Sequence, residues 1–303
     1  MIYSVLEEDK GKRLDFFLQE RYPNFSRSHI QNNLKNEISY ILRNGKKIFK
    51  AGESLRLGDQ IVFEIEEPKE IEIKAQKVDF EIIYQDGDLA VINKPQGLVV
   101  HPCNSCKENT LVNGLLGEIK DLSGINGELR PGIVHRIDKN TCGLLLVAKN
   151  DFAHNDLSKQ IAEKTCKRKY LALIEGTLKE QEGKVETLIG RDKKDRKKMA
   201  VLKDGGKKAI TEYRTVEYFD GYSLVEFSLK TGRTHQIRVH AKHLNHPIVG
   251  DREYGGAEKF GLLGQFLCAY KIEFVHPRTK EKMFFEIDLP EKFRKILNSL
   301  RKD

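Results

Sequence analysis

One carboxylate stands just before an unusually apolar segment. The stretch VHRIDKNTCGLLLVAKN, residues 134–150, places Asp138 between Arg136 and Lys139 and then runs into the apolar positions 144–148. A carboxylate at the mouth of a buried strand loses hydration, so it stays ionised only where cations or hydrogen bonds replace the lost water. Because Arg136 and Lys139 can point away on a strand or turn, we expect the main cationic partner of Asp138 to come from elsewhere in the chain.

The best candidate for that partner lies in KTGRTHQIRVHAKHLNHPIVGD, residues 230–251. Gly232 permits a tight turn and Thr234 can cap the helix that follows, which would hold Arg233 rigidly at a helix N-terminus. We therefore expect Arg233 to pair with Asp138. For either residue alone, a structural salt bridge is the simpler explanation.

Histidines and cysteines invite a metal-binding interpretation that their spacing does not support. The four histidines between residues 235 and 246 do not form HExxH, and no acidic residue lies among them. Cys103 and Cys106 form a single CxxC, whereas a zinc site would need a second pair. We expect no metal, incidental thiols, and histidines that are either satisfied internally or face RNA.

Length and composition indicate a soluble, cytoplasmic protein. The chain has 303 residues, enough for one sizeable core and a smaller module. No apolar run approaches the roughly 18 residues needed to span a bilayer, and the N-terminus lacks a signal-peptide pattern. The five cysteines are odd in number and scattered, as suits reduced thiols in a cytosol. Nothing indicates membrane contact or oligomerisation, and we expect a monomer.

Basic residues are concentrated in one segment. Lysine plus arginine exceed aspartate plus glutamate by 53 to 45, a net charge of +8. Residues 191–208, RDKKDRKKMAVLKDGGKK, hold nine basic and three acidic residues, with Lys197 and Lys198 near the middle. Taken alone, this run is best explained as a solvated hairpin tip. A second basic element that binds RNA would favour phosphate binding instead.

The residue pattern changes at an acidic, proline-containing segment, EIEEPKEIE, residues 64–72. We predict a small domain over 1–66, a linker over about 64–76, and a larger domain over 77–303.

The small domain should contain two helices and a compact hairpin. Apolar residues at helical spacing predict a helix around 14–18 and another over 27–34, with Ser26 as the N-cap of the second. Short strands then flank an Asn44-Gly45 hairpin turn.

The larger domain has a mixed α+β pattern. Strands are predicted at 80–84, 89–92, 144–148, 170–174, 208–216 and 222–229, and helices at 153–161 and from about residue 234. Strands outnumber helices and lack the regular alternation of a doubly wound sheet. We therefore predict an α+β fold with a largely antiparallel mixed sheet and flanking helices.

Several long motifs resemble those of the RluA-type pseudouridine synthases. Residues 134–149 resemble the family signature His-Arg-Leu-Asp-x-x-Thr-Ser/Thr-Gly followed by an apolar strand, although Ile137 and Cys142 replace the usual residues at two positions. Further matches follow in family order at 91–97 with 100–102, 169–173, 229–240, 250–251 and 254–256.

The small domain resembles the S4-type RNA-binding domain, through GKRLDFFL, SRSHIQNNL and RNGKKIFKAGESLRLGD. One departure is NEISYIL, which replaces the usual Gly-x-Val-x-Val strand. The two resemblances together span nearly the whole chain. With both domains present, the chain most resembles the family members that modify large-subunit (23S) ribosomal RNA.

The resemblance implies an isomerase that converts uridine in RNA to pseudouridine without a cofactor. Asp138 would correspond to the essential aspartate, with Arg233 beside it, and Tyr170 to the active-site tyrosine that stacks on uracil. Arg136 would occupy the space left by a flipped-out base. Other RNA contacts are expected from Arg27, Lys46, Lys47, Lys197, Lys198, His235 and Arg238.

Two other functions stay open on sequence grounds. A non-catalytic RNA-binding ribosome assembly factor could use the same fold, but it would be expected to have lost Asp138 or Arg233, and both are present. A metal-dependent nuclease using Asp138 and the histidines would be inhibited by chelators, which an isomerase of this kind would not be.

Overall fold

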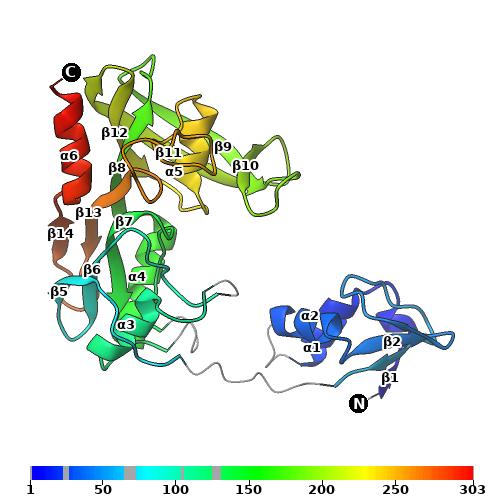
Figure 1. Ribbon diagram of the computed structural model, residues 1–303. Coiled ribbons are helices and arrows are strands. Elements are labelled where there is room, and N and C mark those ends of the chain that lie inside the picture. Colours follow the sequence, from blue (N-terminus) through cyan, green and yellow to red (C-terminus); the bar gives the residue numbers. More distant parts are fainter. Residues whose placement is uncertain (1, 23–26, 65–72, 104–105, 125–130, 303) are drawn as a thin grey trace. The chain divides into compact units, whose positions relative to one another are not determined.

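Two compact units make up the chain. The computed structural model describes residues 2–22, 27–64, 73–103, 106–124 and 131–302 (Figure 1). The units are Met1–Ile71 and Glu72–Asp303, and each has its own hydrophobic core.

In the N-terminal unit, two helices share a core with a four-stranded antiparallel sheet. The helices are α1 (Leu14–Arg21) and α2 (Arg27–Lys35), and the sheet order is β1 (Ile2–Ser4), β4 (Gln60–Val62), β2 (Tyr40–Arg43), β3 (Lys46–Ile48). The hairpin turn is confirmed, because Asn44 and Gly45 have φ angles of 49° and 77°, as a tight β2–β3 connection requires. The predicted cap Ser26 lies outside the described residues.

The C-terminal unit is built on one ten-stranded sheet (Figure 1). The strands are β5 (Glu81–Gln85), β6 (Leu89–Lys94), β7 (Cys142–Ala148), β8 (Lys167–Glu175), β9 (Glu182–Arg191), β10 (Met199–Leu202), β11 (Lys207–Phe219), β12 (Tyr222–Leu229), β13 (Leu267–Val275) and β14 (Lys282–Glu286). Their order is β10-β9-β11-β12-β8-β13-β7-β6-β5, with β14 beside β13. Among the described strands, β7 and β13 form the one parallel pair. The predicted largely antiparallel α+β fold is confirmed.

Helices cover both faces of this sheet around β7. The helices are α3 (Leu111–Glu118), α4 (Asp151–Glu163), α5 (Gln236–His243) and α6 (Glu291–Leu300). Leu145 and Val147 share a core with α3 and α6, while Leu144, Leu146 and Ala148 share another with α4. All seven residues of β7 are buried, which explains why the sequence after Asp138 is continuously apolar rather than alternating.

β7 and β13 approach each other closely at one glycine. Gly143 has a φ of +110° and pairs with Ala269 on β13. A Cβ at position 143 would collide with the carbonyl oxygen of Ala269. The glycine between Cys142 and the apolar run is therefore required by both backbone conformation and space.

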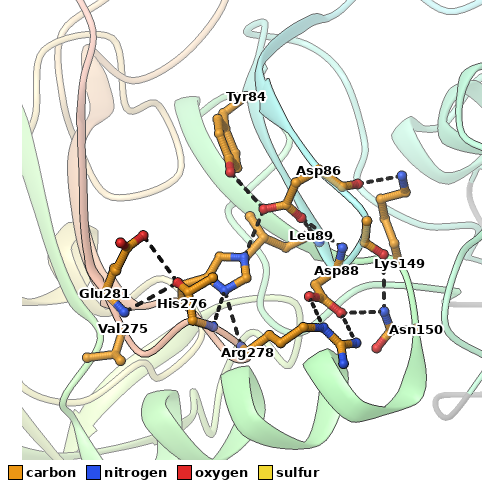
Figure 2. Close-up of polar contacts among 12 residues, drawn as sticks. Tyr84, Asp86, Asp88, Leu89, Lys149, Asn150, Val275, His276, Arg278 and Glu281 are labelled. Carbon is orange, nitrogen blue, oxygen red and sulfur yellow. Dashed lines mark hydrogen bonds and ion pairs between the residues drawn. The ribbon is translucent and has the colours of Figure 1, made fainter.

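A polar network ties together the turns at one edge of the unit (Figure 2). Asp86, in the β5–β6 turn, accepts hydrogen bonds from Tyr84 Oη at 2.7 Å and His276 Nε2 at 2.8 Å. Arg278 binds both carboxylate oxygens of Asp88 at 2.7 and 2.6 Å, and Asn150 donates to the same carboxylate at 2.8 Å. The network joins the β5–β6, β7–α4 and β13–β14 connections.

Among the described residues, no helix is both long enough and apolar enough to cross a bilayer.

Candidate active site

Asp138 lies in a tight turn that leads into β7. Its backbone carbonyl accepts a hydrogen bond from Thr141 N at 3.1 Å. The buried Lys94 supports the turn, because its Nζ donates to the carbonyl of Lys139 at 3.0 Å as well as to those of Pro95 at 2.8 Å and Leu98 at 2.9 Å. Burial lowers the pKa of Lys94 to about 7. The polar turn is thus fixed by carbonyl groups gathered around one lysine.

The cationic partner of Asp138 is Arg238, and the expectation that Arg233 fills this place is wrong. Arg238 Nη1 lies 3.2 Å from Asp138 Oδ2. Arg233 donates its Nε to the carbonyl of Lys208 at 3.0 Å instead. Because α5 begins at Gln236 rather than near Thr234, Arg233 lies in the turn before the helix, whereas Arg238 is a buried residue of the helix itself.

The start of α5 uses a different capping arrangement from the one predicted. His235 occupies the N-cap position with a φ of 56°, and its side chain makes no capping bond. The Gln236 side chain instead binds the turn before the helix, accepting from Arg233 N at 2.9 Å and from Thr231 Oγ1 at 2.7 Å. The helix therefore begins about two positions later than predicted, and Arg233 stays outside it.

Arg238 is held by carboxylates on the loop after α5. Asp251 accepts from Nε at 2.7 Å and from Nη2 at 2.8 Å, and Glu253 accepts from Nη2 at 2.7 Å. The guanidinium also lies 4.7 Å from the ring centre of Tyr254. Although burial alone would lower the pKa of Arg238, the hydrogen bonds and charge of Asp251, with the charge of Asp138, raise it further above its ordinary value.

These contacts also revise the predicted role of Arg238. We expected it to bind substrate, but only 7% of its side chain is exposed and its charge is matched by carboxylates. It therefore positions Asp138 rather than reaching outward to RNA. Asp251 and Glu253 were not predicted as site residues, although a buried arginine demands acidic partners and both follow closely in the sequence.

His235 connects Asp138 to the basic hairpin, which is formed by β9, β10 and the connection between them at residues 192–198. Its Nε2 lies 3.8 Å from Asp138 Oδ1, and its Nδ1 lies 2.8 Å from Tyr254 Oη. Tyr254 Oη accepts in turn from Met199 N at 2.9 Å, at the start of β10. Burial lowers the pKa of His235, so the imidazole is neutral near pH 7. The contact with Tyr254 links the start of β10 to the residues around Asp138.

A pocket of about 380 Å³ brings all three predicted catalytic residues together. Asp138, Tyr170 and Arg233 all line it, as do Arg136 and His235. Tyr170 lies on β8 with only 4% of its surface exposed, and burial raises the pKa of its hydroxyl. The pocket is large enough for a small ligand and has an acid, an aromatic ring and cations on its walls.

Arg238 also lines this pocket, whereas the four lysines predicted to contact RNA are not among its lining residues. Lys197 and Lys198 belong to the β9–β10 connection, where Lys197 is exposed and Lys198 lies 3.8 Å from Asp195. Lys46 and Lys47 are exposed on β3. Arg27 begins α2, but its side chain lies outside the described residues.

The histidines do not gather around a cation site. His240 is buried and contacts Thr211 at 2.8 Å and Thr187 at 3.0 Å, while His246 contacts the carbonyl of Glu175 at 2.7 Å. Within the described part of the chain, no three His, Cys, Asp or Glu side chains are placed to bind a metal ion.

Comparison with known proteins decides the family. Residues 88–243 match the model of a family described as RNA pseudouridylate synthase. The chain belongs to the RNA pseudouridine synthase family. The motifs that resemble RluA-type members lie largely within this match, and the chain is an isomerase that acts on RNA.

Relatives in the pseudouridine synthase family align over nearly the whole chain. An uncharacterized RNA pseudouridine synthase of Bacillus subtilis, YlyB, is 45% identical, with 98% of this chain and 97% of the relative covered. The ribosomal large subunit pseudouridine synthase D of Neisseria meningitidis is 40% identical, with 96% and 79% covered. Among solved structures, human RNA pseudouridylate synthase domain containing 4 is 26% identical with a TM-score of 0.56, covering 73% of this chain and 92% of that one.

Proposed function

We propose that this pseudouridine synthase modifies uridines of large-subunit ribosomal RNA and that Asp138 is its essential carboxylate, acting on a flipped-out uridine. The observation that carries the proposal is the pairing of Asp138 with the buried Arg238 at the wall of a pocket that Tyr170 also lines. The names of relatives such as the Neisseria enzyme support the choice of RNA. The substrate would place the protein in the cytoplasm with the ribosomes.

The reaction requires one bond to break and another to form on the same base. The bond between uracil N1 and ribose C1′ breaks, and a bond forms between C5 and C1′. The hydrogen of C5 leaves as a proton, and N1 gains a proton. No oxidant, reductant or cofactor enters this balance.

Asp138 has a free oxygen for this chemistry. Arg238 binds Oδ2, whereas Oδ1 accepts no hydrogen bond from the described residues and lies 3.8 Å from His235 Nε2. Oδ1 can therefore add to ribose or uracil, or remove a ribose proton, and each route uses a carboxylate whose orientation Arg238 fixes.

Tyr170 is proposed to contact the target uracil. Its ring lies at the pocket wall on β8, where a base can stack on it. Because burial raises the pKa of the hydroxyl, it is protonated at neutral pH and would relay the C5 proton rather than act as a free base.

RNA binding is proposed to involve base flipping and phosphate contacts. A uridine in stacked RNA must leave the stack at a cost of a few kcal/mol, and the exposed Arg136 at the pocket rim would fill the vacated space. Lys197 and Lys198 on the basic hairpin would bind phosphates. We propose that the N-terminal unit is an S4-type domain that adds contacts through Arg27, Lys46 and Lys47.

The test is conversion of uridine in a transcribed 23S ribosomal RNA by the purified full chain. Asp138→Asn should abolish conversion while RNA affinity stays within about threefold, because the pocket and basic surfaces are unchanged. Asp220→Asn, at an exposed turn, is the matched control and should convert at the wild-type rate. Conversion by the Asp138 variant at the wild-type rate would contradict the proposal.

A further inference from the structure

A second arginine lies in the pocket beside Tyr170. Arg168 is two residues ahead of Tyr170 on β8, and alternate residues of a strand face the same side. Both line the pocket. The residues on either side of Arg168 point the other way: Lys167 pairs with Glu273 at 3.1 Å and Lys169 with Glu226 at 3.1 Å.

The guanidinium of Arg168 has no hydrogen-bond acceptor among the residues that the structure describes. Its Nε is buried and has no hydrogen-bond partner among the described residues, and no carboxylate in that part of the chain forms an ion pair with it. A Cβ placed at Gly232 would lie 3.6 Å from both Nη atoms, so the guanidinium lies beside the turn before α5. A buried N–H without an acceptor is unfavourable, which is a reason to look for a ligand.

The pocket holds more positive charge than its carboxylate can match. Asp138 is the one carboxylate on its wall among the described residues, and Arg238 already binds it. Four cations of the lining have no ion pair in the described part of the chain: Arg136, Lys164, Arg168 and Arg233. Of these four, Arg168 is the one with a buried, unsatisfied donor.

We propose that Arg168 binds the phosphate of the target nucleotide inside the pocket, an inference that rests on the proposed function. A guanidinium presents a planar fork of donors that matches phosphate oxygens. Arg168 and Tyr170 are separated by about 7 Å along the strand, a distance that one nucleotide can bridge. Strand β8 would then bind both parts of one nucleotide, with the base on Tyr170 and the phosphate on Arg168.

A purely electrostatic role for Arg168 must be separated from this one. Its positive charge adds to burial in lowering the pKa of His135 to about 3, and it opposes the rise that burial causes in the pKa of Tyr170. Such a role would affect every ligand of the pocket. A phosphate-binding role would affect only ligands that carry a phosphate.

The experiment compares the affinity of uridine with that of uridine 5′- and 3′-monophosphate by calorimetry on the full chain. In the wild type, one of the monophosphates should bind roughly ten- to a hundredfold more tightly than uridine. Arg168→Gln should lose this advantage while its uridine affinity stays within about twofold. Arg168→Lys keeps the charge without the fork and should retain part of the advantage. Lys167→Gln, the neighbour on the opposite face, should match the wild type.

Equal affinity of the wild type for uridine and both monophosphates would overturn the proposal. So would an Arg168→Gln variant that weakens all three ligands alike. Conversion of uridine in 23S ribosomal RNA is measured in parallel on the same proteins. A wild type that converts nothing but shows the phosphate advantage would refute the proposed function and leave the phosphate site standing. A wild type that converts RNA but binds uridine and its monophosphates equally would support the proposed function and refute the phosphate site.

Discussion

Arg238 Nη1 lies 3.2 Å from Asp138 Oδ2, although the two residues are 100 positions apart in the chain. The arginine comes from the buried face of α5 and the aspartate from the turn before β7. Asp251 binds the same guanidinium through two hydrogen bonds, so the orientation of Asp138 depends on a second carboxylate that does not line the pocket.

Replacing Arg238 should be far more damaging than replacing Arg233. Arg238→Lys removes the guanidinium that bridges Asp138 and Asp251. The buried Asp251 then lacks part of its hydrogen bonding, and breaking a buried ion pair lowers the free energy of unfolding by about 3–5 kcal/mol. We expect at least a hundredfold loss of kcat/KM and a lower Tm. Arg233→Lys should keep the Tm and lose less than about tenfold. Single-turnover kinetics and thermal melts check both, and equal losses would contradict the geometry.

Two substitutions of Tyr170 should separate proton transfer from base binding. Tyr170→Phe keeps the ring but removes the hydroxyl, so the isomerisation rate should fall about 10²- to 10⁴-fold with little change in RNA affinity. Tyr170→Leu should also weaken binding of the target, by about 1–3 kcal/mol, because the stacking surface is lost. Single-turnover rates and filter binding measure the two effects. A Phe variant that isomerises normally would exclude the hydroxyl from the chemistry.

Gly143→Ala should strongly destabilise the C-terminal unit. The new methyl group would collide with Ala269 O, and the φ of +110° is strained for alanine. We expect a loss of about 3–5 kcal/mol in the free energy of unfolding. Gly87→Ala is the matched control, since nothing lies within 4 Å of a Cβ there. Denaturant melts measure the free energy of unfolding of both variants. Equal values would contradict the close approach of β7 and β13.

The polar network of Figure 2 predicts an acid-dependent contribution to stability. Hydrogen bonding to Arg278 lowers the pKa of Asp88 from 3.8 to about 2. Because the folded state favours the carboxylate, this contribution is present above pH 3.8 and is lost as the pH falls toward about 2. Solvent screening of the exposed Arg278 limits it to about 1–2 kcal/mol.

Asp88→Asn should therefore be less stable than the wild type at pH 6, and the difference should shrink between pH 4 and pH 2.5. Tm values of the two proteins across this range provide the measurement. A difference that stays constant down to pH 2.5 would show that the ionised carboxylate of Asp88 adds no stability.

The basic hairpin should contribute to the salt dependence of RNA binding. The double variant Lys197→Gln, Lys198→Gln removes two charges from the β9–β10 connection. Plotted as log affinity against log salt concentration, its slope should be shallower by roughly 1–2 units. Lys159→Gln with Lys295→Gln, on exposed faces of α4 and α6, is the charge-matched control and should keep the wild-type slope. Identical slopes in all three proteins would show that Lys197 and Lys198 do not contact RNA phosphates.

Local signals in the sequence were sufficient for much of the fold. The Asn44-Gly45 turn follows from residues that tolerate positive φ, and the buried strand β7 follows from its continuous apolar run. The helix α6 was not predicted, although Phe293, Ile296 and Leu297 repeat at helical spacing. β13 was also missed: the first four residues of LCAYKIEFV are all buried, so only its second half shows an alternating pattern.

The pairing within the site could not be predicted in the same way. The motifs correctly brought Asp138 and Tyr170 to one pocket, but choosing between Arg233 and Arg238 depends on where α5 begins. His235 has a left-handed backbone and the Gln236 side chain binds the preceding turn, so the helix begins two residues later than predicted and leaves Arg233 outside it. That the Nε of Arg168 is buried without a hydrogen-bond partner could not be predicted either, because the spacing of residues does not reveal burial.

The most direct test of the central claim is a map of pseudouridines across ribosomal RNA in cells that lack this gene, by chemical labelling and primer extension. Specific large-subunit sites should disappear, return when wild-type protein is supplied, and stay absent with Asp138→Asn. Restoration by the Asp138 variant, or a map unchanged by loss of the gene, would contradict an aspartate-dependent synthase of large-subunit ribosomal RNA.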